Sequence, residues 1–74
     1  MRFKTRPCAY GFYKRGGLDY VGSGANCSRR LSQQIPKFRP GRIVVKYVST
    51  REQARQLEKS WCRRASPKKN LRCG

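Results

Sequence analysis

Two short tyrosine-bearing segments lie close together in the sequence and flank a pair of glycines. The segments are Gly11-Phe12-Tyr13 and Tyr20-Val21-Gly22, and the glycine pair is Gly16-Gly17. If the glycine pair forms the two-residue turn of a β-hairpin, Tyr13 lies opposite Tyr20 and both phenols project from one face. Two neighbouring phenols on a strongly cationic chain suggest a site for phosphodiester chemistry. An ordinary cross-strand aromatic pair is the alternative interpretation.

The register predicted from the glycine turn also pairs other residues across the hairpin. Phe12 and Val21 share the second face, and Lys14 lies opposite Asp19. This pair accounts for one of only three acidic residues in the chain.

The other two acidic residues lie in the second half of the sequence. Ser49-Thr50-Arg51-Glu52 fits a capping box, in which a serine is followed three residues later by a glutamate. Glu58 has no such role, because it lies in mid-helix beside an apolar stripe. An intrahelical pair with Arg55 is the structural alternative, and it contributes only about 0.2–0.5 kcal/mol.

The charge of the chain points to a polyanionic partner. Nineteen Lys and Arg against three Asp and Glu give a net charge of +16, spread from Arg2 to Arg72. Nucleic acid is the usual partner of such a surface. No apolar run approaches the ~20 residues that span a bilayer, and residues 1–20 lack the apolar region of a signal peptide. We therefore expect no membrane partner and a cytoplasmic location.

The four cysteines allow two interpretations. A small, basic, four-cysteine chain is typical of a secreted peptide held by disulfides. Against this, three of the cysteines fall in a predicted strand and two predicted helices, where small buried thiols commonly pack. We therefore expect reduced thiols. Without histidine or a Cys-x-x-Cys spacing, a structural zinc site is not expected. The cysteines are Cys8, Cys27, Cys62 and Cys73.

Hydrophobic periodicity and turn residues predict five elements in the order β-β-α-β-α. Cys27, Leu31 and Ile35 form a helical stripe, as do Ala54, Leu57, Trp61 and Ala65. Three strands with helices packed on them make an α+β domain with a small three-stranded antiparallel sheet. We expect one domain over residues 1–74. The elements are strands 7–14 and 18–22, a helix from its cap Asn26 to a stop at Pro36, a strand 43–48, a helix after the capping box that ends before Pro67, and a basic tail 67–74.

The sequence resembles the GIY-YIG nuclease domain, which occurs in phage homing endonucleases, some restriction enzymes and the incision subunit of bacterial excision repair. The segments 11–13 and 20–22 are similar to the two family motifs, and the resemblance covers residues 10–70. Arg30 follows the second-motif tyrosine by ten residues, as in the family. Glu58, Pro67 and Asn70 reproduce the spacing of the family's glutamate and its Pro-x-x-Asn segment.

The sequence departs from the family pattern at three points. The interval between the two motif tyrosines is shorter than in many members. Gln34 stands where many members have His or Tyr, and Ser23 stands where repair-type members often have Lys. The nuclease interpretation survives these differences, but no proton-handling role is assigned to Gln34 or Ser23.

The resemblance implies a divalent-metal-dependent endonuclease of a bacterial or phage-infected cell that leaves a 5′-phosphate and a 3′-hydroxyl. Glu58 would bind one Mg²⁺ or Mn²⁺, and Arg30 would hold the scissile phosphate. Tyr13 is the first candidate for the general base, and Tyr20 would position the phosphate or the water. Dense positive charge, or the metal, would have to lower the pKa of a phenol for this role. Gly22, Ser23 and Asn70 would support the site.

The expected substrate is duplex or branched DNA, cut with little sequence specificity or with specificity supplied by a second protomer or a partner protein. One alternative is a cationic antimicrobial peptide stapled by disulfides, and another is a non-catalytic basic protein that binds nucleic acid. The expected nucleic-acid contacts are Arg29, Arg30, Lys37, Arg39, Arg42, Lys68 and Lys69.

Overall fold

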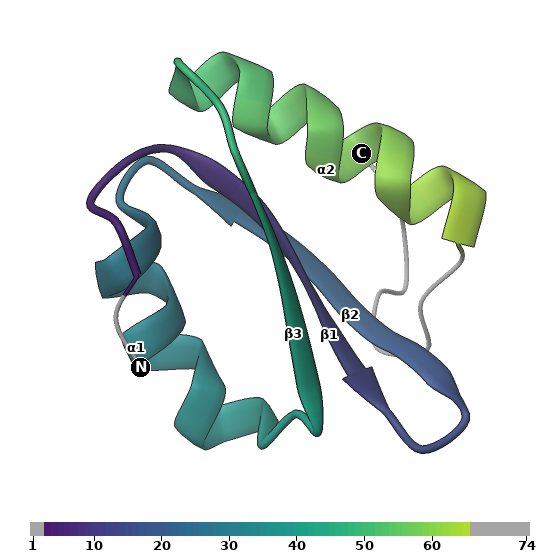
Figure 1. Ribbon diagram of the computed structural model, residues 1–74. Helices are drawn as coiled ribbons and strands as arrows, with labels where there is room; N and C mark the ends of the chain where they lie inside the picture. Colours follow the sequence, from purple (N-terminus) through teal and green to yellow (C-terminus); the bar gives the residue numbers. More distant parts are fainter. Residues whose placement is uncertain (1–2, 66–74) are drawn as a thin grey trace.

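The computed structural model describes residues 3–65 (Figure 1). The predictions for the tail 67–74, and with them those for Lys68, Lys69 and Asn70, lie outside the described residues. Neither helix within residues 3–65 is long and apolar enough to cross a bilayer.

The predicted fold class and element order are confirmed. A three-stranded antiparallel sheet has the strand order β2-β1-β3, and helices α1 and α2 lie on either side of it (Figure 1). The elements are β1 (Cys8–Lys14), β2 (Gly17–Gly24), α1 (Cys27–Phe38), β3 (Arg42–Tyr47) and α2 (Arg51–Ala65).

The register of the β1–β2 hairpin differs from the prediction. Phe12, not Tyr13, lies opposite Tyr20, and Tyr10 lies opposite Gly22. The predicted pairing of Tyr13 with Tyr20 is therefore wrong, as is that of Phe12 with Val21. Side chains alternate along a strand, so a slip of one residue between the strands places Tyr13 and Tyr20 on opposite faces of the sheet.

The turn itself explains the slip. Gly16 and Gly17 both have positive φ, 101° and 118°, but Gly17 already pairs with Lys14 in the ladder. The reversal therefore comes one residue earlier than expected, and an irregularity beside Tyr13 shifts the register again. The predicted position of Lys14 opposite Asp19 is also wrong, because Lys14 pairs with Gly17 in the ladder, but the two side chains still form a salt bridge of 3.8 Å.

Each face of the sheet has its own apolar cluster. On the α1 face, Tyr10 and Phe12 are fully buried and pack with Leu31 of the helix. On the α2 face, the cluster centres on Trp61. Gly11 allows this packing, because a Cβ there would lie 2.6 Å from a ring carbon of Trp61.

Helix α1 begins as predicted but ends later. The side chain of Asn26 accepts a hydrogen bond from the backbone N–H of Arg29 at 3.1 Å, which confirms the N-cap. The helix then continues through Pro36 to Phe38, so the predicted stop is wrong. A proline in the last turn removes only one helical hydrogen bond. The helix instead ends at Arg39, whose left-handed backbone (φ 48°) is typical of a C-cap.

Helix α2 has a capping box, one residue later than predicted. The backbone N–H of Gln53 donates to the hydroxyl of Thr50 at 3.1 Å, and the Gln53 side chain accepts from the N–H groups of Ser49 and Thr50. The predicted box of Ser49 and Glu52 is therefore wrong. Glu52 is exposed and lines a groove instead.

The prediction of reduced thiols is also wrong. Cys8 and Cys27 form a disulfide, which ties the start of β1 to the first residue of α1, and Cys62 is disulfide-bonded as well. The backbone N–H of Cys27 donates to the carbonyl of Arg6 at 2.9 Å, and that of Ser28 to the carbonyl of Lys4 at 3.0 Å. The chain before β1 therefore holds the helix at its N-terminus, and these two amides are not directed at a ligand.

Candidate active site

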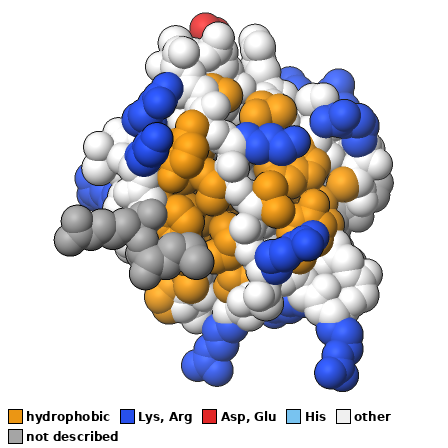
Figure 2. All heavy atoms as spheres, viewed as in Figure 1, with side chains coloured by type: hydrophobic (Ala, Val, Ile, Leu, Met, Phe, Trp, Pro, Cys, Tyr) orange, Lys and Arg blue, Asp and Glu red, His pale blue; other side chains and the backbone are white. Residues whose placement is uncertain are grey.

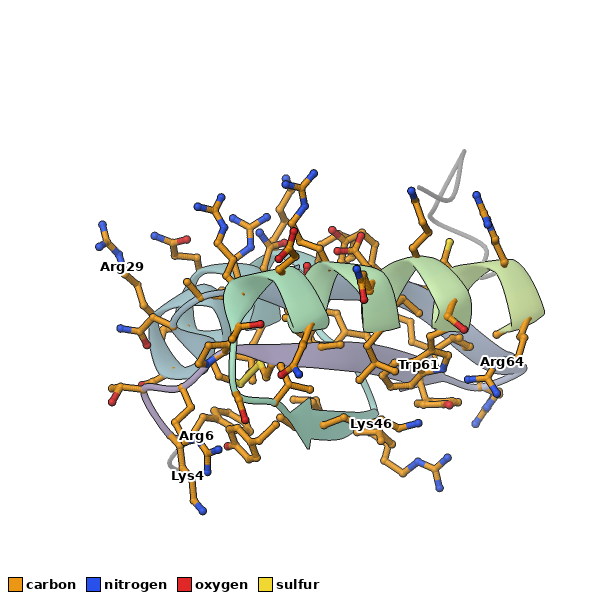
Figure 3. All side chains as sticks on the ribbon, turned by 90° about the horizontal axis from the view of Figure 1, so that it is seen from above. Lys4, Arg6, Arg29, Lys46, Trp61 and Arg64 are labelled. Carbon is orange, nitrogen blue, oxygen red and sulfur yellow. A yellow bond between two sulfur atoms is a disulfide. The ribbon has the colours of Figure 1, made fainter. Side chains whose placement is uncertain are left out.

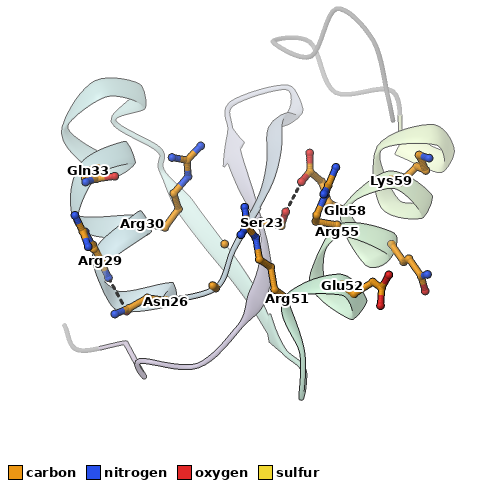
Figure 4. Close-up of a pocket in the computed structure, with 13 residues that line it drawn as sticks. Ser23, Asn26, Arg29, Arg30, Gln33, Arg51, Glu52, Arg55, Glu58 and Lys59 are labelled. Carbon is orange, nitrogen blue, oxygen red and sulfur yellow. Dashed lines mark hydrogen bonds between the residues drawn. The ribbon is translucent and has the colours of Figure 1, made fainter.

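A groove of about 810 Å³ lies between α1 and α2, beside strand β2 (Figure 4). Within the described residues β2 is an edge strand, because it neighbours only β1 in the sheet. Both helices contribute charged side chains to the groove. From α1 come Arg29 and Arg30, and from α2 come Arg51, Glu52, Arg55, Glu58 and Lys59.

Strand β2 brings the two helices to one place because its side chains alternate between the faces of the sheet. Gly22 and Gly24 lie against residues of the α1 face, whereas Ser23 contacts α2. Arg30 approaches the strand from α1 and Glu58 from α2, on either side of Ser23 (Figure 4). The candidate site therefore straddles the free edge of the sheet.

The two glycines make room for the site residues. A Cβ on Gly22 would lie 2.5 Å from the hydroxyl oxygen of Tyr10 and 2.9 Å from the ring of Tyr20. A Cβ on Gly24 would lie 3.1 Å from the Cβ and Cγ atoms of Arg30. The absence of a side chain at Gly22 therefore leaves room for the Tyr10 ring, and its absence at Gly24 leaves room for the aliphatic part of Arg30.

Two phenols and a guanidinium gather on the α1 side of β2. Tyr10 is fully buried, Tyr20 is half-buried, and their ring centroids lie 6.4 Å apart. Burial raises the pKa of Tyr10 to about 12; the Coulombic effects of Tyr20 and Glu58 add to the rise, and Arg30 opposes it. Burial and then Glu58 also raise the pKa of Tyr20. The interaction with Tyr10 raises the pKa of Arg30.

These shifts fix the charge state of the cluster. At neutral pH both phenols are protonated and Arg30 is charged, so all three side chains are hydrogen-bond donors. The buried hydroxyl of Tyr10 has no aligned hydrogen-bond acceptor among the described residues, although Arg30 is near it. A buried polar atom without a partner costs stability, so the burial of this hydroxyl beside Arg30 is not explained by folding alone.

Glu58 is the carboxylate that faces this cluster. It is half-buried and accepts a hydrogen bond from the hydroxyl of Ser23. Within residues 3–65 the only salt bridge joins Lys14 to Asp19, so the alternative pair of Glu58 with Arg55 does not form there. Among the described residues the carboxylate therefore keeps lone pairs free for another ligand.

The donor set fits a hydrated hard cation. Among the described residues no group of three His, Cys, Asp or Glu side chains could hold a metal. Glu58 would thus be the single protein carboxylate, with the Ser23 hydroxyl beside it. Mg²⁺ suits such a site, because it commonly keeps several waters and binds through one or two carboxylates plus substrate phosphates.

Tyr13 is not part of this cluster. Its ring packs on the α2 face with Leu18, and the guanidinium of Arg42 lies 4.6 Å from its centroid. Tyr10 takes the expected place beside Tyr20 and Arg30. The interval between the two site tyrosines is then ten residues rather than seven, which removes the shortened spacing noted in the sequence. That spacing was the signal that could have identified Tyr10.

The structure divides the predicted nucleic-acid contacts. Arg29 and Arg30 line the groove, whereas Lys37, Arg39 and Arg42 do not and lie around the end of α1 and the start of β3. Gln34 is also outside the groove, which its neighbour Gln33 lines. Three basic residues of α2 that line it were missed by the sequence analysis, namely Arg51, Arg55 and Lys59.

Sheet order and helix placement define a class of fold, that of the GIY-YIG endonuclease domain. Among solved structures the chain is similar to the GIY-YIG N-terminal endonuclease domain of UvrC from Thermotoga maritima, which is bound to magnesium as its catalytic divalent cation. The TM-score is 0.81 at 22% sequence identity, over 92% of this chain and 86% of that one. No family model matches the sequence, and no curated protein matches it. The fold implied by the family resemblance is thus confirmed.

Proposed function

We propose that this protein is a divalent-metal-dependent endonuclease that hydrolyses phosphodiester bonds of nucleic acid, with DNA as the expected substrate. One observation carries the proposal. Tyr10, Tyr20 and Arg30 from one face of the sheet and Glu58 from the other meet at the edge of β2, beside an open groove.

Arg30 and Glu58 divide the electrostatic work of the reaction. Arg30 offers a forked, permanently charged donor for the scissile phosphate and for the charge that gathers on it. Glu58 would hold the Mg²⁺ or Mn²⁺, with Ser23 fixing the orientation of the carboxylate. The bound ion would lower the pKa of a water and offset charge on the phosphoryl oxygens.

Tyr10 and Tyr20 act as donors in this scheme, not as bases. With its pKa raised to about 12, Tyr10 holds its proton at neutral pH. Its hydroxyl is buried beside Arg30 and does not line the groove, so it would donate a hydrogen bond to a phosphoryl oxygen or to the attacking water only once the Arg30 side chain moves to bind the phosphate. This replaces the role first expected of Tyr13, whose ring lies on the other face of the sheet.

The cysteine pairing bears on where the protein works. Disulfides persist mainly in oxidising compartments, so the Cys8–Cys27 bond favours such a compartment over the cytoplasm expected from the sequence. It also agrees with one premise of the alternative, a cationic membrane-active peptide stapled by disulfides. That alternative gives no role to a buried phenol beside an arginine, and leakage of anionic vesicles without nicking would favour it.

Plasmid nicking tests the proposal. The purified protein should convert supercoiled DNA to the open circle in Mg²⁺, stop on addition of EDTA, and resume when Mg²⁺ or Mn²⁺ is restored. A protein that binds the plasmid but never nicks it, in either metal, would be a non-catalytic binder. Nicking that persists in EDTA would show a contaminant or another chemistry.

A further inference from the structure

A row of three cations follows one side of helix α2 along the groove, outside the tyrosine–arginine cluster. Arg51, Arg55 and Lys59 stand four residues apart, so they lie one above the other on the same helix face. A rise of 1.5 Å per residue places successive members about 6 Å apart along the helix. All three are exposed and line the groove, as Figure 4 shows for α2.

A solvated helix face would be the ordinary explanation of such a row, but among residues 3–65 no ion pair or ring contact involves these cations. Within residues 3–65 none of them forms a salt bridge, although the acidic Glu52 and Glu58 stand on the same helix. None of them lies over an aromatic ring among the described residues. Other surface cations do, since Arg42 and Lys46 each lie 4.6 Å from a ring centroid.

The face of the molecule viewed in Figure 1 looks different. Figure 2 shows Lys and Arg side chains there around and among a broad area of apolar side chains. In the groove the cations are instead in a row, and Arg29 stands on the opposite wall. The two walls therefore offer positive charge on both sides of the site.

We propose that Arg51, Arg55 and Lys59 bind successive phosphates of one nucleic-acid strand and hold that strand along α2. The inference rests on the proposed function for the nature of the ligand, and it adds how the ligand is held. The spacing of the row is comparable to that between successive phosphates of a strand. Glu58 lies between Arg55 and Lys59 in sequence, so a strand on the row passes the candidate metal ligand. Such contacts position the backbone and read no bases.

Removal of the three cations should change the salt dependence of nucleic-acid binding. Each phosphate contact by a cation contributes about 0.9 to the slope of log affinity against log salt on duplex DNA. Removing three contacts should therefore lower this slope by about 2.7, whereas general loss of positive charge lowers affinity with little change of contact number.

Two triple variants of equal charge separate these effects. The first is Arg51→Gln/Arg55→Gln/Lys59→Gln, and its matched control removes three exposed cations that do not line the groove. Figure 3 shows two of these control residues, Arg6 and Arg64, pointing away from the side on which Arg29 lies. The control substitutions are Arg6→Gln, Arg15→Gln and Arg64→Gln.

Binding is measured in EDTA, so that no cleavage occurs, by fluorescence anisotropy of a labelled duplex and a labelled single strand over a range of NaCl. On the duplex, the row variant should have a slope lower by about 2.7, and the control should keep the slope of the wild type. A charge-retaining variant, Arg51→Lys/Arg55→Lys/Lys59→Arg, should bind as the wild type does. Circular dichroism confirms that each variant is folded.

Equal loss in both triple variants, or loss in neither, would overturn the inference. The experiment also separates it from the proposed function, because binding in EDTA needs no catalysis. If only the row variant has a lower salt slope and the wild-type protein never nicks DNA, the phosphate row is supported and the endonuclease proposal is contradicted. If the wild-type protein nicks DNA with metal but the row variant binds as the control does, the endonuclease proposal is supported and the phosphate row is contradicted.

Discussion

The hydroxyl of Ser23 donates a hydrogen bond to the carboxylate of Glu58, and this bond joins the edge strand β2 to helix α2 at the candidate site. The strand and the helix are 35 residues apart in sequence at this point. A carboxylate with one oxygen fixed in this way is held ready for a ligand, as hydrogen bonds to metal-binding carboxylates generally achieve. Ser23 is thus a positioning residue in the proposed mechanism.

Ser23→Ala should weaken metal binding more than it slows the reaction at saturating metal. Loss of such a supporting hydrogen bond commonly costs about 10–100-fold in metal affinity or activity. The measurement is a Mg²⁺ titration of plasmid nicking. Ser32→Ala is the control, since its hydroxyl bonds to the backbone carbonyl of Ser28 within α1. Ser23→Thr keeps the hydroxyl and should restore the titration. If the Mg²⁺ concentration at half-maximal nicking is unchanged in Ser23→Ala, Ser23 does not position the Glu58 carboxylate for the metal.

Removal of single phenolic hydroxyls should affect the three tyrosines differently. Tyr10→Phe and Tyr20→Phe should each lower the nicking rate by about 10²-fold, the usual effect of losing one donor to a developing charge. Tyr13→Phe should nick at close to the wild-type rate, because its ring packs on the other face. Single-turnover rates in saturating Mg²⁺ measure this. A severe defect in Tyr13→Phe with normal rates in the other two variants would contradict the assignment of Tyr10 and support Tyr13 as the catalytic tyrosine.

The stability of the fold should fall in alkali partly through Tyr10. Its pKa is raised to about 12 by burial, from an ordinary value near 10. The folded state therefore favours the neutral phenol, and this contribution is present below about pH 10 and lost as the pH rises through about 12. Urea unfolding at a series of pH values should show a smaller loss in Tyr10→Phe than in the wild type. Equal losses in both proteins would contradict the shift.

Below pH 10 the same Tyr10→Phe variant should be at least as stable as the wild type. The hydroxyl is buried with no hydrogen-bond partner among the described residues, so its removal relieves a desolvation cost. Loss of activity without loss of stability would mark a group kept for chemistry rather than for folding.

The Cys8–Cys27 disulfide should contribute substantially to stability. It closes a loop across 19 residues, and a bond of this kind contributes about 3 kcal/mol by constraining the unfolded chain. Cys8→Ala/Cys27→Ala should lower the free energy of unfolding by about that amount, as measured by urea denaturation. Because the bond holds the start of the helix that carries Arg30, DNA binding should weaken too. Free-thiol titration of the native protein gives an independent check, and reactive thiols at both positions would contradict the pairing.

The sequence predicted the elements well because their signals are local. The cap at Asn26, the β-branched run that became β3 and the apolar stripe of α2 each depend on neighbouring residues, and all three formed where expected. The order of the elements then restricts the topology to a few arrangements, of which the observed sheet is one.

The sequence failed where two segments had to be aligned with each other. The hairpin register depended on one assumption about the glycine turn, and a slip of one residue exchanged Tyr10 for Tyr13 in the site. The alternation of Cys8, Tyr10 and Phe12 on one buried face was the stronger guide, since burial on the α1 side decides the register. The basic row of α2 was missed for a related reason, because only the fold brings that helix beside β2.

The measurement that tests the central claim most directly compares two glutamates of the same helix. Glu58→Gln and Glu52→Gln remove the same charge from two residues that line the same groove, but only Glu58 contacts Ser23. Metal-dependent nicking and duplex binding in EDTA should be measured side by side. Glu58→Gln should bind DNA and lose nicking, and Glu52→Gln should keep both. Full nicking by Glu58→Gln, or equal loss in the two variants, would contradict the proposed site.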